Sequence, residues 1–413
     1  MAPPKQAYST TVDALVPNDP RVQHLDAQVG PYTYHYMLAT PPGPDAPRAT
    51  ILLVHGWPDL GMAWRYQVPF LAEKLRCRVI VPDMLGYGRT SAPADPAEYS
   101  LRNIAEQMRA LVAHVLGNPK EAVILGGHDW GGAAVWRIAM WCPDLVRAVF
   151  SLNVPFAPPL RRLIEGEELV QRVPSFRYQL QLASPEAERI VDASPERLRG
   201  FVNAIYGGRV AGDRHKFAFS TQTGVVESAL DAGVGPASLM GPDMVDYYVR
   251  EYARHGLHGP TNWYRTRRIN FEDELPRFVV AKEGDEEWRC QCPAMVVMAE
   301  KDITLPPALA DGTEKWFEGP GGLRKEVVKG VGHWGMWQDP KTVNGFIGSF
   351  VEDVLGGQLK GEALKRGEMP RYWGTSILGH IRGHLPVFLE YEYSREASTC
   401  CFHMRERLFN VVL

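Results

Sequence analysis

The chain is poor in the features that mark several special classes of protein. Its 413 residues include six cysteines, and no two are spaced as the C-x-x-C pair expected of a zinc or redox site. No apolar run approaches the roughly 18 residues that a membrane-spanning helix requires. Residues 1–19 carry prolines and charges where a secretion signal has an apolar stretch. We therefore expect a cytoplasmic protein with reduced thiols and no membrane span.

An excess of positive charge is also missing. The sequence has 45 Lys and Arg against 48 Asp and Glu, a formal net charge of −3. A nucleic-acid or anionic-membrane partner would need a clustered positive field, and the one short cluster, Arg265, Arg267 and Arg268, is more typical of a solvated helix face. The residues that are present, 45% hydrophobic and 23% charged, indicate a packed globular protein.

Two parts of the chain alternate strands with helices. Short apolar runs predict strands at residues 32–39, 51–55, 79–83, 122–126, 146–152, 294–299 and 325–329. Such strands joined by helices predict a mostly parallel sheet covered on both faces. Between Pro155 and Cys292 the pattern is helical and irregular. We therefore predict an α/β core in two parts, residues 1–155 and 293–357, a helical cap over residues 156–292, and a C-terminal extension of unknown role over residues 358–413.

A glycine-flanked carboxylate follows the strand predicted at residues 122–126. The segment Gly127-His128-Asp129-Trp130-Gly131-Gly132 has the small-x-nucleophile-x-small pattern of the strand-to-helix turn in α/β-hydrolases, with aspartate where serine is common. The glycines let the chain turn sharply and expose the central side chain. Alone, a loop aspartate is more often a turn residue or a helix cap. We interpret His128 as a structural histidine.

Three other segments support a catalytic role for Asp129. Asp302 follows one predicted strand and His333 follows the next, and the order nucleophile, acid, histidine is the one expected of this fold. Upstream, His55-Gly56-Trp57-Pro58 closes the strand at residues 51–55. The backbone amides of Trp57 and Trp130 are the expected donors of an oxyanion hole.

Together these motifs resemble the epoxide hydrolases of the α/β-hydrolase superfamily, of the soluble epoxide hydrolase type. The matching segments are HGWP at 55–58, GGHDWGG at 126–132, AEKD at 299–302, GHW at 332–334, FRYQL at 176–180 and GPTNWYR at 259–265. The likeness spans roughly residues 20–355. It implies an α/β-hydrolase fold, in which helices flank a mostly parallel central sheet and a helical cap is inserted. It also implies that Tyr178 and Tyr264 point at the nucleophile and hydrogen-bond the epoxide oxygen.

The resemblance implies an enzyme that converts a small apolar epoxide and water to a vicinal diol. Asp129 would displace the ring oxygen and form a covalent alkyl ester, with Tyr178 and Tyr264 assisting ring opening. His333, supported by Asp302, would then activate water to hydrolyse the ester. Water is the only co-substrate, so we expect no cofactor and no metal. The aromatic residues expected to wall the substrate pocket are Phe156, Trp263 and Trp334.

Two other functions remain open from the sequence. A haloalkane dehalogenase-like hydrolase would use the same aspartate, but a halide leaving group needs no acid, and the two tyrosines supply one. A non-catalytic binding protein of this fold would usually lack the nucleophile, the acid, the histidine or the cap donors. The sequence leaves undecided which epoxide and enantiomer are used, whether the role is detoxification or endogenous metabolism, and the oligomeric state.

Overall fold

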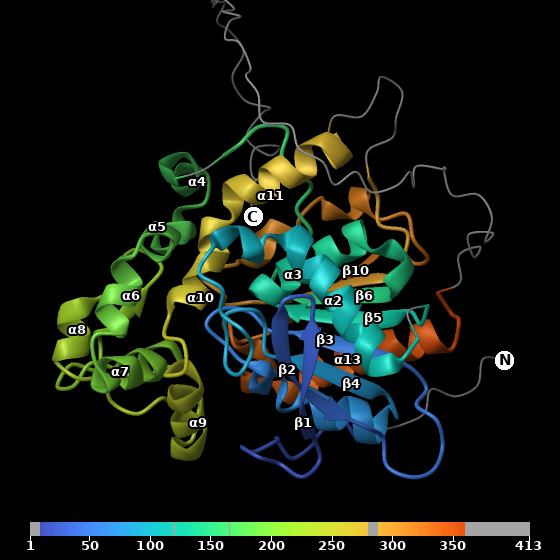
Figure 1. The fold of residues 1–413 in the computed structure, drawn as a ribbon, viewed down its shortest axis with the longest axis horizontal. Helices are drawn as coiled ribbons and strands as arrows, with labels where there is room; N and C mark the ends of the chain where they lie inside the picture. The colour runs from blue at the N-terminus through green and yellow to red at the C-terminus, as the bar shows by residue number, and fades with distance from the viewer. Residues whose placement is uncertain (1–8, 119, 165, 280–287, 360–413) are drawn as a thin grey trace, which may run out of the picture.

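A twisted sheet forms the centre of the protein (Figure 1). The computed structural model describes residues 9–118, 120–164, 166–279 and 288–359. The eight strands of the main sheet follow the order β1-β2-β4-β3-β5-β6-β9-β10. β2 pairs antiparallel with β1 and with β4, and every other neighbouring pair is parallel. The prediction of a mostly parallel sheet is confirmed.

The strands lie within a residue or two of their predicted positions. Their bounds are β1 (Gln23–Val29), β2 (Tyr32–Ala39), β3 (Thr50–Val54), β4 (Arg78–Pro82), β5 (Val123–His128), β6 (Val146–Leu152), β9 (Ala294–Ala299) and β10 (Leu323–Val328). We did not predict β1, a polar edge strand in which only Ala27 and Val29 are buried. A small hairpin, β7 (Phe219–Ser220) with β8 (Gly224–Val225), was not predicted either.

Helices cover both faces of the sheet. Those of the core are α1 (Gln67–Pro69), α2 (Leu101–Leu116), α3 (Trp130–Trp141), α12 (Gly335–Gln338) and α13 (Pro340–Leu355). Local signals set their ends: the Ser100 hydroxyl accepts a hydrogen bond from the Asn103 amide at the start of α2, and Asp339 caps α13 in the same way. β3 and β5 are buried along their whole length, as expected of central parallel strands.

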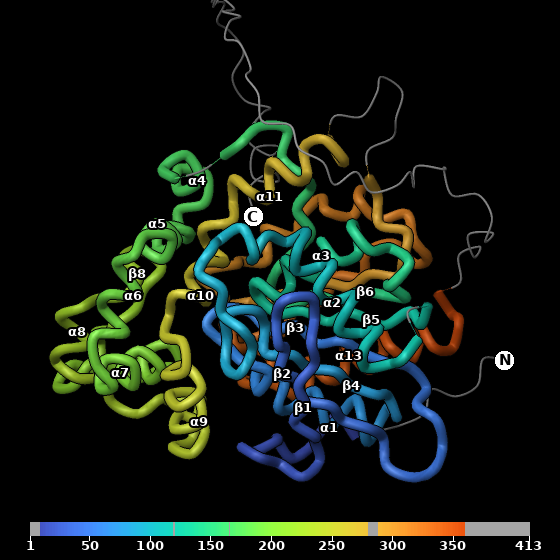
Figure 2. Tube along the Cα trace, viewed as in Figure 1, coloured from blue at the N-terminus to red at the C-terminus, as the bar shows by residue number. Residues whose placement is uncertain are grey.

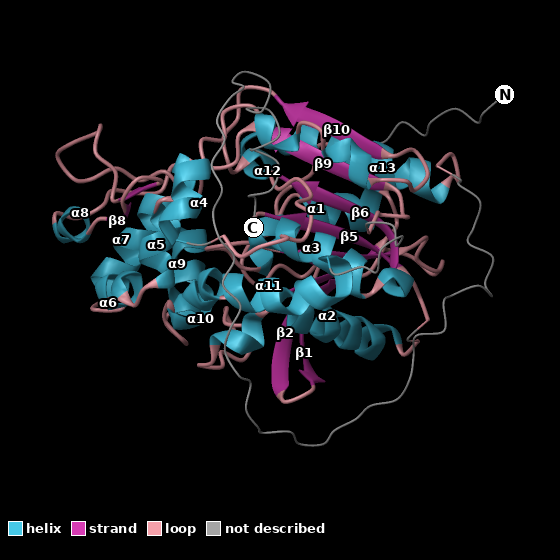
Figure 3. Ribbon diagram, turned by 90° about the horizontal axis from the view of Figure 1, so that it is seen from above, coloured by secondary structure: helices cyan, strands magenta, loops and turns pink. Residues whose placement is uncertain are grey.

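The chain between β6 and β9 forms a set of helices that we call the helical insert (residues 156–292). Its helices are α4 (Gly166–Arg172), α5 (Tyr178–Ala183), α6 (Glu186–Val191), α7 (Pro195–Ile205), α8 (Glu227–Asp231), α9 (Pro242–Tyr252), α10 (His258–Asn262) and α11 (Arg267–Glu274). In Figure 2, α4 to α9 lie to one side of the sheet, and α11 returns toward the core. Figure 3 shows the insert on the side to which the arrowhead of β10 points, which is the carboxyl edge of the parallel strands.

The register of the sheet aligns the ends of the strands that carry the predicted site. Val54 pairs with Gly127, and Leu152 pairs with both His128 and Val297. The loops that follow β3, β5, β9 and β10 therefore leave the sheet at one edge, beneath the insert. Ligands of such sheets bind at this edge.

Among the described residues, no helix is both long and apolar enough to cross a bilayer. The cysteines in this part of the chain, Cys77, Cys142, Cys290 and Cys292, are free thiols. Residues 360–413 lie outside the described residues. They make up nearly all of the predicted C-terminal extension and include Cys400 and Cys401.

Candidate active site

Asp129 occupies a strained turn between β5 and α3. Its backbone angles are φ 53° and ψ −127°, a combination that residues other than glycine rarely adopt. The glycines around it allow close packing, since a Cβ on Gly127 would lie 2.1 Å from the Gly131 carbonyl oxygen and one on Gly131 would lie 2.0 Å from that of Val54. The turn therefore projects the Asp129 carboxyl from the carboxyl edge of the sheet. Strain of this kind is typical of active sites.

The two carboxyl oxygens of Asp129 have different neighbours. The Trp57 amide donates a hydrogen bond of 2.8 Å to Oδ1, and the Trp130 amide also hydrogen-bonds this carboxyl group. Oδ2 lies 3.6 Å from Nε2 of His333. Burial raises the pKa of Asp129, while His333 and the two amides act in the opposite direction. Oδ1 is thus held by the Trp57 amide, and Oδ2 faces the histidine.

His333 lies between two carboxylates. Its Nδ1 is 2.8 Å from Oδ2 of Asp302, whose Oδ1 accepts hydrogen bonds from the amides of Thr304 and Leu305. Burial lowers the pKa of His333, but Asp302 and then Asp129 outweigh it and raise the pKa to about 9. At neutral pH the ring is therefore an imidazolium that supports ionised Asp129.

The two tyrosines come from separate segments of the insert and meet above Asp129. Tyr178 begins α5, and Tyr264 lies in the 3-10 turn η6 (Trp263–Arg265). Their ring centroids are 6.0 Å apart, and both side chains are buried. Burial raises the pKa of each phenol above its ordinary value of about 10. Both hydroxyls therefore remain protonated over the pH range in which proteins are stable.

A cavity of about 340 Å³ joins these groups. Asp129, His333, Tyr178 and Tyr264 all line it, with mainly apolar side chains around them. Trp57 and Trp334 contribute to the wall from the core, and Phe217 and Phe219 from the insert. A volume of this size is at the lower end of the range for small-molecule sites. The arrangement places a carboxyl group, a histidine and two phenols around one apolar space.

The structure places two of the predicted pocket residues elsewhere. Phe156 does not line the cavity, because it packs against the rings of Trp136 and Phe317. Trp263 lies behind the wall, where its indole N–H donates to the Leu85 carbonyl oxygen at 3.1 Å. An aromatic residue close to a motif in sequence need not face the site, because the local backbone decides where its side chain points.

His128, which the sequence predicts to be a structural histidine, supports the loop that contains His333. Its Nε2 lies 3.1 Å from the His333 carbonyl oxygen, which also accepts a hydrogen bond of 2.6 Å from Asn153 Nδ2. Burial, followed by the nearby His333, lowers the pKa of His128 to about 3. The neutral ring therefore donates to the His333 carbonyl group and holds the loop in place.

Sequence reasoning missed a buried acid next to the site. Asp59 follows Trp57-Pro58 directly, and its Oδ1 accepts hydrogen bonds from the Leu60 amide and from the Tyr248 hydroxyl. Burial raises the pKa of Asp59 to about 7. The sequence signal that could have indicated Asp59 is its position directly after the HGWP segment. Nothing in the sequence indicated Tyr248, which lies 189 positions away.

Comparisons with known proteins agree with this geometry. Residues 49–340 match the model of the alpha/beta hydrolase fold family. The epoxide hydrolase srdG of Neurospora crassa is 46% identical over 349 residues, which cover 83% of this chain and 99% of that protein. The bifunctional epoxide hydrolase 2 of Rattus norvegicus is 30% identical over 338 residues, and the match covers 79% of this chain but only 55% of that longer protein.

A solved structure supports the same fold. Epoxide hydrolase I of potato (Solanum tuberosum) superposes with a TM-score of 0.63 over 80% of this chain and 99% of that one, at 24% sequence identity. The sheet, the turn at Asp129 and the family match define an α/β hydrolase. Within that class, the chain belongs to the epoxide hydrolase family, as the Neurospora relative shows.

Proposed function

We propose that this protein hydrolyses small apolar epoxides to vicinal diols through a covalent ester on Asp129. The observation that carries the proposal is the presence of two buried phenols and a buried carboxylate in one cavity. A carboxylate alone can displace a leaving group from saturated carbon. The opening of an epoxide also needs an acid for the oxygen that departs, and Tyr178 and Tyr264 supply it.

In the first step, Oδ2 of Asp129 attacks an epoxide carbon. The amide of Trp57 holds Oδ1, which leaves Oδ2 as the oxygen free to react. A carbon–oxygen bond of the ring breaks while the new ester bond forms. Negative charge then develops on the epoxide oxygen, which takes a proton from one tyrosine and accepts a hydrogen bond from the other.

In the second step, His333 activates water. Formation of the ester removes the negative charge of Asp129, one of the carboxylates that raise the pKa of His333. The pKa of His333 consequently falls, and the ring becomes available as a base. Water loses a proton to Nε2 while its oxygen attacks the ester carbonyl carbon, and the negative charge rests on the oxygen held by the Trp57 and Trp130 amides. Collapse of this intermediate breaks the bond between the carbonyl carbon and the diol oxygen, and the imidazolium of His333 returns its proton to that oxygen. The new Asp129 carboxyl group loses its proton to the tyrosine that gave one up in the first step, which restores both the carboxylate and the phenol.

We further propose that two parts of the chain have different functions. Residues 1–155 and 293–357 form the catalytic core, and residues 156–292 act as a cap domain that covers the cavity. The cap supplies both phenols and the apolar side chains Phe217 and Phe219. Closure over the site keeps bulk water away from the reacting groups.

Turnover of two substrate classes tests the proposed function. With an aryl epoxide such as styrene oxide we expect diol, measured by chromatography, and with a bromoalkane of similar size we expect no halide release. His333→Gln, assayed in parallel, should form the ester without multiple turnovers. Halide release without epoxide turnover would instead assign the protein to the dehalogenases. Binding of both substrates with no reaction would indicate a hydrolase-fold binding protein.

A further inference from the structure

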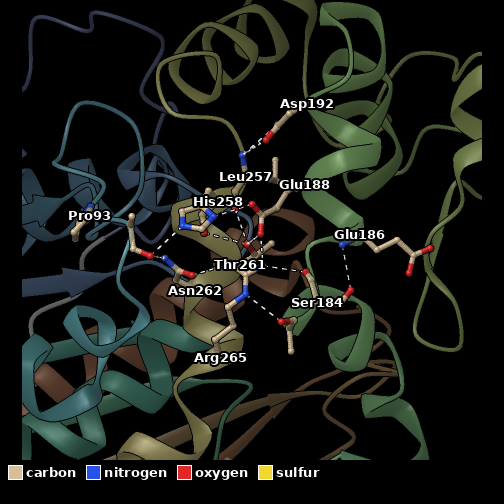
Figure 4. Close-up of polar contacts among 12 residues, drawn as sticks. Pro93, Ser184, Glu186, Glu188, Asp192, Leu257, His258, Thr261, Asn262 and Arg265 are labelled. Carbon is tan, nitrogen blue, oxygen red and sulfur yellow. Dashed lines mark hydrogen bonds and ion pairs between the residues drawn. The ribbon is translucent and has the colours of Figure 1, made fainter.

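Arg265 joins the two segments that carry the tyrosines (Figure 4). It follows Tyr264 in the chain, yet its guanidinium group reaches the far end of α5. Nε donates to the Ala183 carbonyl oxygen at 3.1 Å, and one terminal nitrogen donates to that of Ser184 at 2.9 Å. The other terminal nitrogen donates to Oδ1 of Asn262 at 2.7 Å, within the segment that contains Tyr264. A single side chain therefore contacts both segments.

Glu188 on α6 holds the guanidinium group in this position. Its Oε1 accepts hydrogen bonds from Arg265 and from the Thr261 hydroxyl, and its Oε2 lies 2.8 Å from Nδ1 of His258. The Arg265 and Glu188 side chains are only 15% and 18% exposed. At this burial a charge-assisted pair is stronger and better defined than a surface ion pair.

The same network contacts the core. Nε2 of His258 lies 3.1 Å from the Ala94 carbonyl oxygen, and Asn262 donates to that oxygen at 3.3 Å. The Leu257 amide at the start of α10 donates to Asp192 near the end of α6. The segment that carries Tyr264 is therefore fixed to α6 and to the core loop. At the start of α5 the Tyr178 amide donates to the Thr221 carbonyl oxygen at 3.0 Å, and Arg265 holds the opposite end of this helix against the Tyr264 segment.

The length of α5 explains why a contact at its far end matters for Tyr178. This helix has six residues, with Tyr178 first and Ala183 last. At about 1.5 Å per residue, the carbonyl groups bound by Arg265 lie roughly 8 Å along the axis from Tyr178. A tilt at the held end would move the phenol relative to Tyr264. Both hydroxyls must reach one epoxide oxygen, and misplacement by about 1 Å costs a reaction up to roughly 100-fold in rate.

We propose that Arg265, held by Glu188, is a positioning residue that sets the spacing of the Tyr178 and Tyr264 hydroxyls and so controls ester formation. Arg265 does not line the cavity, and it acts through the two tyrosines. The inference rests on the proposed function of those tyrosines. It assigns to Arg265 an effect on the first chemical step and none on the hydrolysis of the ester.

Arg265→Lys keeps the positive charge and removes the fork that reaches both segments. In single-turnover experiments, we expect the rate of ester formation to fall roughly 10- to 100-fold, while the rate of ester hydrolysis stays within about twofold. Arg199→Lys is the matched control, because Arg199 forms an exposed ion pair with Asp246 in the same insert. This control should leave both rates unchanged.

Arg265→Lys in a Tyr178→Phe background distinguishes positioning from a general structural role. Once one hydroxyl is absent, their spacing no longer matters, so the lysine substitution should cost less than about threefold. The same fold loss in both backgrounds, or an equal loss in both half-reactions, would overturn the proposal. Glu188→Gln should reproduce the selective loss at smaller magnitude, and it provides the test if Arg265→Lys does not fold.

The rate of ester formation by the unmodified enzyme distinguishes a failure of this inference from a failure of the proposed function. If it forms no ester on Asp129 under the same conditions, the proposed function fails. If it forms the ester at a rate that Arg265→Lys does not change, only the positioning role fails.

Discussion

The two sides of the cavity are built by different means. On the core side, the reactive groups follow the ends of hydrogen-bonded strands, so backbone pairing fixes Asp129, Asp302 and His333. On the insert side, the side chains of Arg265 and Glu188 join the segments that carry Tyr178 and Tyr264, and the Tyr178 amide also donates to the Thr221 carbonyl oxygen. The core side carries charge, while the insert side carries neutral donors. The charged groups of the site thus follow the hydrogen-bonded strands of the sheet, and the phenols come from the insert.

Contacts between the two sides are also made by side chains. The Tyr206 hydroxyl donates to the Pro58 carbonyl oxygen at 2.8 Å, and the Tyr248 hydroxyl donates to Asp59. These bonds connect α7 and α9 to the loop that contains the Trp57 amide. A substitution of Tyr206 or Tyr248 should therefore disturb the Trp57 loop, whereas a substitution of Arg265 should change how the phenols meet the substrate and leave the charged groups in place.

Loss of the core nucleophile should have the largest effect. Asp129→Asn keeps the size of the side chain and tolerates the positive φ, but an amide is a poor nucleophile. We expect diol formation to fall by roughly 10⁴-fold or more in steady-state assays. Intact-mass measurement should verify that the amide persists. Activity within tenfold of the unmodified enzyme would mean that the core side does not carry the nucleophile.

Removal of the histidine should separate the two half-reactions. In His333→Gln, ester formation should continue while its hydrolysis slows by roughly 10²- to 10⁴-fold, because no general base remains. Mass analysis of the peptide that contains Asp129 should show the added mass of the substrate. Absence of that adduct, with turnover retained, would contradict the assigned order of steps.

Removal of both phenols should block the reaction at the opposite step. Tyr178→Phe combined with Tyr264→Phe should slow ester formation by roughly 10²- to 10⁴-fold, with each single variant retaining more activity. The double variant should show no adduct in the first turnovers. An adduct formed at the normal rate would mean that the tyrosines of the insert form part of the cavity wall but do not assist ring opening.

The pH dependence should differ between the two steps. Ester formation needs ionised Asp129, and burial raises the pKa of that group. The rate of this step should therefore fall with decreasing pH, by about tenfold per unit below that pKa. Ester hydrolysis needs neutral His333, so its rate should rise with pH and level off below pH 9, because the ester lacks one of the charges that raise the pKa to about 9. Identical profiles in single-turnover measurements would contradict the assignment of separate groups to the two steps.

Much of the core side could be predicted from the sequence. Short apolar strands followed by Gly127-His128-Asp129, Asp302 and His333 carry their own local signals, and parallel strands bring such ends to one edge. β1 was missed because it is a polar edge strand with little apolar alternation. The aspartate, acid and histidine could therefore be proposed together from their positions along the chain.

The insert side was less accessible to sequence reasoning. Tyr178 and Tyr264 were identified by resemblance alone, since an isolated buried tyrosine has no distinctive pattern. The misplacement of Phe156 and Trp263, and the unexpected contact of Tyr248 with Asp59, share a cause: irregular helices and turns decide where those side chains point. Tertiary contacts between distant segments leave no local periodicity to detect.

One measurement tests the covalent route most directly. A single turnover of an epoxide in oxygen-18 water, with enzyme in excess, is followed by mass analysis of the diol and of the peptide that contains Asp129. We predict an unlabelled diol and one heavy oxygen on Asp129, because the diol takes its new oxygen from the carboxylate and water replaces it. A heavy oxygen in the diol, with none on Asp129, would show direct attack by water and contradict the ester mechanism.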